Sequence, residues 1–311
     1  MSGYNTESVN VQFLNQSFLD KIDQGLEKQA GAAMSAFVRQ KLREDGFTRK
    51  VLTPVQITAA ELDRQLTEEP TIIVEKEPDS IAATLPFLGQ NTVRYFKGAR
   101  YPVTFEKIAS QTFKKSKFEL ATYRTDIRTI LQENSVKDLQ AQEDLGFYNS
   151  IVTIATANSN TATIGTFNVA GLMAGAKLLI AKKLPVGCIL MSESLYATLL
   201  TQPSTQVGSP AASELFMGEK SLDNFYGYKI ITTNKSYASS GGSQSADSII
   251  PDNVAVFFAP EAYLGQFYSL QDATVFLKAE ADIIEFMTYE AIGVGIGNVN
   301  GAIVVTYTAG Y

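Results

Sequence analysis

The most informative segment of the sequence is RYPVTFEKIAS, residues 100–110, which leads through LATY, residues 120–123, into a long helical pattern. Within this segment the apolar residues Val103 and Phe105 alternate with polar or charged neighbours. A two-residue period is typical of a strand that exposes one face. The sequence therefore predicts a half-exposed β-strand ahead of a helix.

The region around this strand, residues 70–118, has little continuous hydrophobicity. A short strand is predicted at residues 72–74, and the same alternation recurs at Val93 and Tyr95, with turn-forming residues between the strands. About 50 residues of hairpin-like strand are too few for a separate domain. We expect a long, charged β-arm that projects and rests on a neighbouring molecule.

Helical periodicity occurs on both sides of this predicted arm. Apolar residues across 17–43 recur close to every 3.6 positions, which predicts one amphipathic helix, weakened by Gly25 and Gly31. Across residues 125–155 they recur at multiples of four, which predicts a single helix roughly 45 Å long. Residues 1–16 are polar and are expected to form an extended arm.

The rest of the chain mixes helices and strands without a regular βαβ series, so the predicted fold class is α+β. Ser192 is the expected N-cap of one of the helices. The predicted helices are 167–182, 192–201 and 210–218, and the predicted strands are 187–191, 228–233, 254–258, 273–278, 282–296 and 302–307.

The composition excludes several classes of protein. The 311 residues include no His, no Trp and a single Cys, Cys188. Without His, much acid–base and metal chemistry is lost, and one Cys allows neither an intrachain disulfide nor a Cys-rich zinc site. No signal peptide is recognisable, and no apolar run approaches the roughly 20 residues needed to span a bilayer. We predict a soluble protein of a reducing cytoplasm.

Charge is distributed in blocks of opposite sign. The net charge is −6, which argues against a protein that coats itself with nucleic acid. Residues 61–79 hold seven acidic and two basic groups, whereas residues 94–124 hold eight basic and two acidic groups. Such blocks favour complementary pairing, either within the fold or between copies of the chain.

No catalytic, cofactor-binding or metal-binding residue is predicted. The glycine-rich stretch 293–301 matches no dinucleotide-binding register and is expected to be a bend between strands. Adjacent acids such as Glu143 and Asp144, or Glu68 and Glu69, could in principle serve a glycosidase. We expect them instead to be solvated charges on surfaces.

The order of these elements resembles that of the major capsid proteins of tailed phages, which have the Hong Kong 97-type fold. The resemblance rests on residues 100–110 leading into 120–123 and the long helix, and on VAVFFAPEAYLG, residues 254–265, ahead of the last strands. It covers nearly the whole chain through element order and loose motifs.

The resemblance implies an N-terminal arm, an extended β-hairpin loop, a peripheral domain with a long spine helix, and an axial domain. The expected regions are 1–69, the N-terminal arm and helix; 70–118, the extended loop; 119–166, the peripheral domain with its spine helix; 167–271, the axial domain; 272–298, the return strands of the peripheral domain; and 299–311, the last strand rejoining the axial domain.

The function implied by the resemblance is that of a major capsid protein, not an enzyme, which self-assembles into an icosahedral shell around double-stranded DNA. The expected partners are other copies in hexamers and pentamers, a scaffolding protein and a portal, with a decoration protein as an optional further partner. Neither sequence-specific DNA binding nor a membrane is expected. The shell would assemble in the cytoplasm of the host bacterium. Contacts between subunits are predicted at Glu75, Glu77, Arg94, Lys97, Arg100, Lys114 and Lys115.

Crosslinking members of this family join a Lys of the extended loop to an Asn of a neighbour, assisted by a Glu. No local motif here matches that chemistry, so a noncovalent shell is predicted. Three alternatives remain open: an encapsulin-type nanocompartment, a carboxylate-dependent hydrolase, and an oligomeric phage tail or adhesion protein.

Overall fold

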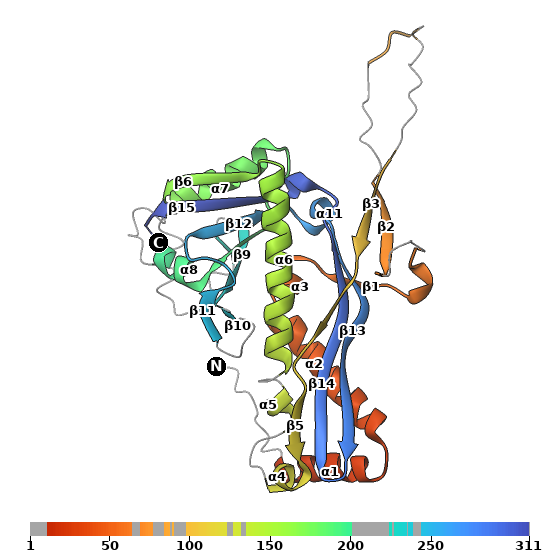
Figure 1. Cartoon of the computed structure of the whole chain (residues 1–311). Helices are drawn as coiled ribbons and strands as arrows, with labels where there is room; N and C mark the ends of the chain where they lie inside the picture. The colour runs from red at the N-terminus through yellow and green to blue at the C-terminus, as the bar shows by residue number, and fades with distance from the viewer. Residues whose placement is uncertain are drawn as a thin grey trace.

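The computed structural model places the described residues in two larger sheets, a long helix and a projecting arm (Figure 1). The predicted strand at Val93 and Tyr95 and the predicted helix at 210–218 lie outside the described residues. The described residues are 11–63, 69–76, 84–87, 89, 98–122, 127–131, 135–200, 224–225, 227–234, 236–238 and 244–310.

The larger sheet has six strands and lies between helices. Its strands follow the order β6 (Thr161–Thr166), β15 (Ala302–Ala309), β12 (Val254–Phe258), β7 (Cys188–Ser192), β9 (Tyr228–Thr233) and β8 (Asn224–Phe225). A separate two-stranded ribbon is formed by β10 (Ser236–Ala238) and β11 (Gln244–Ser248). The flanking helices are α6 (Lys137–Ala157), α7 (Val169–Ala181) and α8 (Glu193–Leu200).

Alternate residues of the central strands pack on opposite faces of this sheet. Ile189 and Met191 of β7 belong to the hydrophobic cluster that includes α7 and α8, whereas Cys188 and Leu190 belong to the cluster that includes α6. Every residue of β7 and β12 is buried, as expected for strands covered on both faces. The predicted bounds of β9 and β12 are confirmed, and Ser192 caps α8 by accepting the Leu195 N–H at 3.1 Å.

The second sheet is built on a long hairpin of β13 (Gln266–Glu280) and β14 (Ile283–Gly295). Its edges are formed by three short strands: β1 (Pro54–Gln56), parallel to β13, and β4 (Glu106–Ala109) and β5 (Phe113–Ser116), antiparallel to β14. Residues 106–116 therefore run along the hairpin. Ile108 and Phe113 pack on its apolar face, which holds the segment there. This differs from the expectation that all of residues 70–118 project.

The helix predicted across residues 17–43 is two helices, α1 (Val11–Asp23) and α2 (Glu27–Asp45). The chain turns at Gly25, whose φ is +72°, a left-handed conformation that glycine adopts without a Cβ penalty. The Gly25 and Leu26 N–H groups donate to the Ile22 and Lys21 carbonyls, which is the Schellman pattern of a helix end. Helical structure also begins at Val11, inside the segment expected to be extended.

Gly25→Ala is expected to lower the free energy of unfolding by about 1–2 kcal/mol. In the left-handed conformation the alanine Cβ lies too close to the following carbonyl oxygen, whereas glycine has no Cβ. The matched control is Gly146→Ala, at an exposed position inside α6 with no atom within 4 Å of the added Cβ. This control should raise stability by roughly 0.5–1 kcal/mol. Chemical denaturation of both variants measures the difference, and the same sign in both would contradict the assigned conformation.

The predicted single helix over 125–155 is also divided. The structure has α5 (Ile127–Leu131) and α6, with a π-helical turn at residues 135–136 ahead of α6. The polar run QENS, residues 132–135, interrupts the apolar stripe there. At 1.5 Å per residue, α6 is about 32 Å long, and it runs between the six-stranded sheet and the long hairpin (Figure 1).

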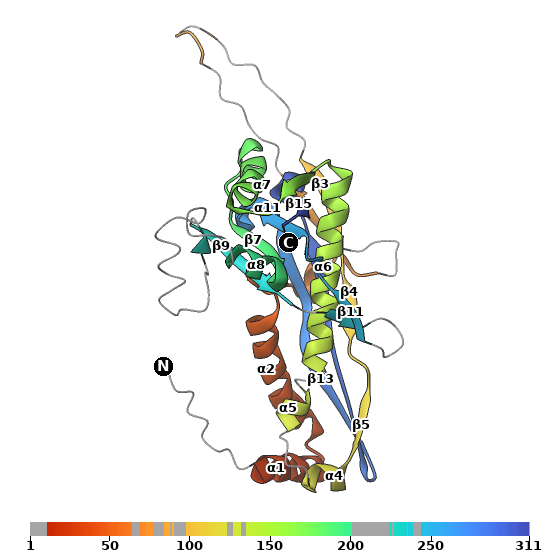
Figure 2. The same ribbon diagram turned by 90° about the vertical axis from the view of Figure 1, so that its left-hand side faces the viewer.

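The free end of the long hairpin is enclosed by helices. Figure 2 shows α1 and α4 (Lys117–Thr122) together at that end of the molecule. Phe18 of α1 stacks on Phe286 of β14, with ring centroids 6.2 Å apart, and Leu120 of α4 is buried in the same cluster. The N-terminal helices are therefore part of the hydrophobic core of this region.

Candidate inter-subunit interface

The arm is a two-stranded ribbon that extends beyond both sheets (Figure 1). It consists of β2 (Thr71–Lys76) and β3 (Ala99–Thr104), paired antiparallel from Thr71↔Thr104 to Lys76↔Ala99. Its root is fixed by a small hydrophobic cluster in which Val103 and Phe105 are buried against Ile57 and Tyr268. The arm therefore starts from a packed base.

Glycines of β14 allow the root of the arm to pack closely on the hairpin. A Cβ added at Gly295 would lie 2.9 Å from Val103 and 3.0 Å from Tyr268, and one added at Gly293 would lie 3.1 Å from Phe105. These separations are too short for larger residues, so the glycines set the distance between arm and sheet. The predicted bend between strands is confirmed, because β14 ends at Gly295 and β15 begins at Ala302.

Charged residues on the arm face each other across the ribbon. Glu75 lies opposite Arg100, and their carboxylate and guanidinium atoms are 2.6 Å apart with both side chains exposed. An exposed pair of this kind contributes at most about 1 kcal/mol, so both charges stay accessible to a partner. The other predicted contact residues of the arm, Glu77, Arg94 and Lys97, lie outside the described residues.

The predicted contact residues Lys114 and Lys115 lie on β5, away from the projecting ribbon. Lys114 pairs with Glu285 of the adjacent β14 at 2.5 Å, and Lys115 lies next to it in register with Ile284. Lys117 also finds a partner in its own chain, Asp23, at 2.7 Å. Part of the basic block at residues 94–124 is thus neutralised within the subunit. A role for Lys114 and Lys115 in contacts between subunits stays a prediction.

A buried charge cluster joins the N-terminal region to α6 and the hairpin. Arg49, on the short helix α3 (Thr48–Val51), donates to both carboxylate oxygens of Glu143 at 3.0–3.1 Å and to Glu290 at 2.8 Å. These three side chains are at most 2% exposed. The Arg49 guanidinium also lies 5.8 Å from the ring centroid of Phe267. One cation therefore serves two carboxyl groups in a buried site.

Burial raises the pKa of both carboxyl groups in this cluster. The pKa of Glu290 is raised to about 8, because burial and the nearby charge of Glu143 outweigh the opposing charge of Arg49. Its Oε1 is buried with no hydrogen-bond partner. A proton on Glu290 leaves one carboxylate, Glu143, as the anionic partner of Arg49.

This proton makes stability depend on pH. The folded protein retains it up to a pH of about 8, whereas an unfolded Glu releases it near 4.5, so the free energy of unfolding should fall as pH rises between those values. Glu290→Gln, which keeps the shape but cannot titrate, should flatten that part of the curve. Melting temperatures of both proteins from about pH 5 to 9 test this, and identical slopes would contradict the assignment.

The expectation that Glu143 and Asp144 are solvated is wrong, because both are buried on the inner side of α6. Asp144 accepts hydrogen bonds from the Thr48 N–H at 2.9 Å and the Thr48 hydroxyl at 2.7 Å. The acids therefore hold α3 against α6. Of the other acidic pair, Glu69 is exposed and Glu68 lies outside the described residues.

Sequence reasoning missed Arg49 and Glu290, although the second carries a local signal. Glu290 follows the two-residue period of Ile284, Phe286 and Ile292, which all point into the core. A charged residue in phase with a buried face predicts a buried partner. No comparable signal marks Arg49, because its partners lie 94 and 241 positions away.

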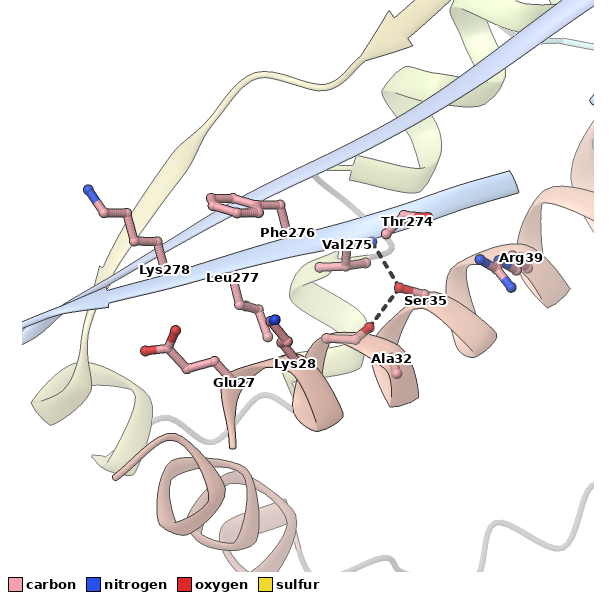
Figure 3. A pocket seen from close by; sticks show the side chains of 11 residues that line it. Glu27, Lys28, Ala32, Ser35, Arg39, Thr274, Val275, Phe276, Leu277 and Lys278 are labelled. Carbon is pink, nitrogen blue, oxygen red and sulfur yellow. Dashed lines mark hydrogen bonds between the residues drawn. The ribbon is translucent and has the colours of Figure 1, made fainter. Parts of the chain in front are cut away.

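The described residues include no group of three or more metal-ligating side chains placed to hold an ion. None of the helices that the structure describes combines the length and the apolar character needed to cross a membrane. Figure 3 shows one concave feature of the described residues, a groove between α2 and β13 lined by both apolar and charged side chains.

Comparison with known proteins finds likeness in structure rather than in sequence. No family model and no curated protein matches the sequence. A chain from Microbacterium phage Oxtober96 matches with a TM-score of 0.56 at 11% identity, over 85% of this chain and 91% of that one. The virus-like particle from Pyrococcus furiosus gives 0.55 at 18% identity, over 88% and 97% of the two chains.

A third solved structure is the capsid of Cyanophage P-SCSP1u, with a TM-score of 0.54 at 13% identity, over 85% of this chain and 87% of that one. Each match spans nearly the whole of both chains, so the likeness includes the sheets, the long helix and the hairpin together. The chain has the Hong Kong 97-type capsid fold, and the α+β fold predicted from its sequence is confirmed.

Proposed function

We propose that this protein is the major capsid protein of a tailed double-stranded DNA phage, which self-assembles into an icosahedral shell around the genome. The observation that carries the proposal is the match over about nine-tenths of their length to chains from phages, one of them described as a capsid structure. The projecting arm supports it, because a ribbon with exposed charges and no core of its own needs a neighbour to rest on.

The proposed role of each part of the chain in the shell follows the regions expected from the sequence. Within residues 1–69 and 70–118, the ribbon of β2 and β3 would reach a neighbouring subunit, whereas α1, α2 and residues 106–116 pack on the hairpin of their own subunit. Residues 119–166 and 272–298 would form the peripheral domain, and residues 167–271 and 299–311 the axial domain. The packed root of the arm supports this, since a fixed base aims the ribbon in one direction. Many weak contacts, summed by symmetry, would then close a noncovalent shell.

The proposed partners are those of a shell assembled in the host cytoplasm and retained in the virion. Copies of the chain would form hexamers and pentamers, helped by a scaffolding protein and completed by a portal, with a decoration protein as a further possible partner. The net charge of −6 supports a wall that encloses DNA without binding its sequence.

We propose that the protein has no catalytic role. Two of the acids considered for a hydrolase support a structural reading, because Glu143 is bonded to Arg49 and Asp144 to Thr48, and both are closed off from solvent. A hydrolase would instead need two carboxyl groups facing a substrate across an open cleft.

A second candidate is a shell that encloses protein cargo, as an encapsulin-type nanocompartment does. The observation that favours it is the match to a particle from a cellular organism, the virus-like particle from Pyrococcus furiosus, at 18% identity over 97% of that chain. The two functions differ in what the particle contains. Nuclease-protected DNA inside particles isolated from the native host would favour the phage, and a co-purifying enzyme would favour the compartment.

Assembly itself tests the proposed function. The full-length protein is expressed with and without a candidate scaffolding protein, sized by sedimentation and viewed by negative-stain electron microscopy. We expect closed particles in at least one condition. A protein that stays monomeric in both would contradict the proposal, and tubes or small rings would favour a tail or adhesion protein.

A further inference from the structure

The short helix α3 separates the buried charge cluster from solvent. Its Arg49 is buried against Glu143 and Glu290, whereas the next residue, Lys50, is exposed. The helix has four residues and is followed by β1, a three-residue strand at the edge of its sheet. Short elements of this kind open locally more readily than long central ones, because few backbone hydrogen bonds hold them.

Carboxylates hold both ends of the segment that contains α3 and β1, residues 46–56. Near its start, Asp144 accepts from the N–H and the hydroxyl of Thr48 at 2.9 and 2.7 Å. After α3, Glu261 accepts from the N–H and the hydroxyl of Thr53, each at 3.0 Å. The buried cluster lies between these two attachments, so the segment is closed largely through contacts with acids.

The charges around the cluster do not balance when every acid is ionised. The titratable groups that face it are Arg49 of α3, Glu143 and Asp144 of α6, Glu290 of β14 and Asp272 of β13, with the exposed Glu106 of β4 on the same face of the sheet. One cation thus faces several carboxyl groups. A proton on one of the two glutamates bonded to Arg49 reduces this excess of negative charge.

Protonation therefore favours the closed segment. In the closed form, burial and the charge of Glu143 raise the pKa of Glu290 to about 8, against the effect of Arg49. Opening would admit water and return this carboxyl group to its ordinary pKa of 4.5. Closure is thus firmest at acidic pH and weakens as pH rises between those two values. Phe47 and Leu52 stay anchored in the core, so the open form is always a minor species.

We propose that residues 46–56 form a proton-controlled lid over Glu143 and Glu290, which is closed most firmly when Glu290 carries a proton and opens locally as it ionises. The lid leads directly to Ile57, which belongs to the hydrophobic root of the arm and donates its N–H to the Ser269 carbonyl at 2.9 Å. A change of pH would therefore alter how firmly the base of the arm is held. The inference rests on the buried cluster and does not depend on the proposed function.

Hydrogen exchange of the full-length protein at pH 5.5 and 7.5 tests the lid. The reporter amides are those of Lys50, Val51 and Leu52, which donate to carbonyls of the same segment. After correction for the intrinsic pH dependence of exchange, their opening constant should rise about 50- to 100-fold between the two pH values. The central strand β7 reports global unfolding, and the lid should open roughly tenfold or more as often at each pH. Equal opening constants in the two segments would overturn the lid.

Two variants separate the role of Glu290 from that of other acids. Glu290→Gln cannot titrate, so the rise in the lid's opening constant should shrink to less than about fivefold. The matched control is Glu261→Gln, which weakens the contact with Thr53 and leaves the cluster intact. It should raise lid exchange at both pH values and keep the full difference between them. A wild-type opening constant that does not change with pH, or a full rise in Glu290→Gln, would overturn the proposal. Loss of the rise in Glu261→Gln would also overturn it, by assigning the pH response to the outer contact.

Discussion

Replacing Arg49 with Met is expected to lower the free energy of unfolding by about 3–5 kcal/mol, because it leaves Glu143 and Glu290 buried without their cation. The methionine fills part of the volume, so the loss comes from uncompensated charge rather than from a cavity. Chemical denaturation followed by circular dichroism measures it. The effect should be largest at high pH, where Glu290 also loses its proton.

The matched control for this variant is Glu290→Gln. At neutral pH the glutamine amide replaces a protonated carboxyl group, accepting from Arg49 and donating to Glu143, so the change should cost less than about 1 kcal/mol. Glu143→Gln in the Arg49→Met background should restore part of the lost stability, because it removes the stranded charge. A loss of less than about 1 kcal/mol for Arg49→Met would show that the cluster does not hold α3, α6 and β14 together.

Changing Arg94, Lys97 and Arg100 together to Glu is expected to abolish closed shells while the subunit stays folded. The prediction is motivated by the basic block at residues 94–124 and by the exposure of Arg100 on a ribbon with no core of its own. Repulsion between like charges would then act at every copy of the contact, so a modest loss per contact is multiplied over the shell. Sedimentation and electron microscopy measure particle yield, and circular dichroism checks the fold.

A matched control for the triple change is Lys50, Lys137 and Lys182 to Glu. These lysines are exposed on or beside three different helices, and their reversal changes the net charge by the same amount without concentrating it on the arm. The control should still assemble. Normal shells from the arm variant, or equal losses from both variants, would remove the role assigned to the arm.

Local patterns in the sequence were sufficient to predict the bounds of two strands of the six-stranded sheet, β9 and β12. The apolar runs at residues 228–233 and 254–258 gave the strand bounds found in the structure, because both faces of that sheet are covered and its strands are continuously apolar. Ser192 was recognisable as a cap because a hydroxyl ahead of an acidic first turn has a local meaning.

Helix boundaries were less readable where the apolar period continues through a break. The spacing across residues 17–43 does not change at Gly25, yet the left-handed backbone there ends α1. The polar run at residues 132–135 leaves only a short gap in the apolar stripe, since its flanking apolar residues remain in phase. The N-terminal helices pack on the hairpin, so tertiary contacts rather than periodicity set these bounds.

The buried charges and the groove depend on contacts between distant parts of the chain. Glu143 looked like any exposed acid because Arg49, its partner, is 94 positions away, and only the fold brings the two together. The groove exists because α2 lies beside β13, more than 230 residues later in the sequence. Pairings of this kind follow from topology, which element order alone did not supply.

A cryo-electron microscopy reconstruction of assembled protein tests most directly whether this chain is a shell subunit. We predict a closed icosahedral particle in which each subunit has the fold described above and each arm crosses onto a neighbouring subunit. Particles without icosahedral symmetry, or arms that fold back on their own subunits, would contradict the account.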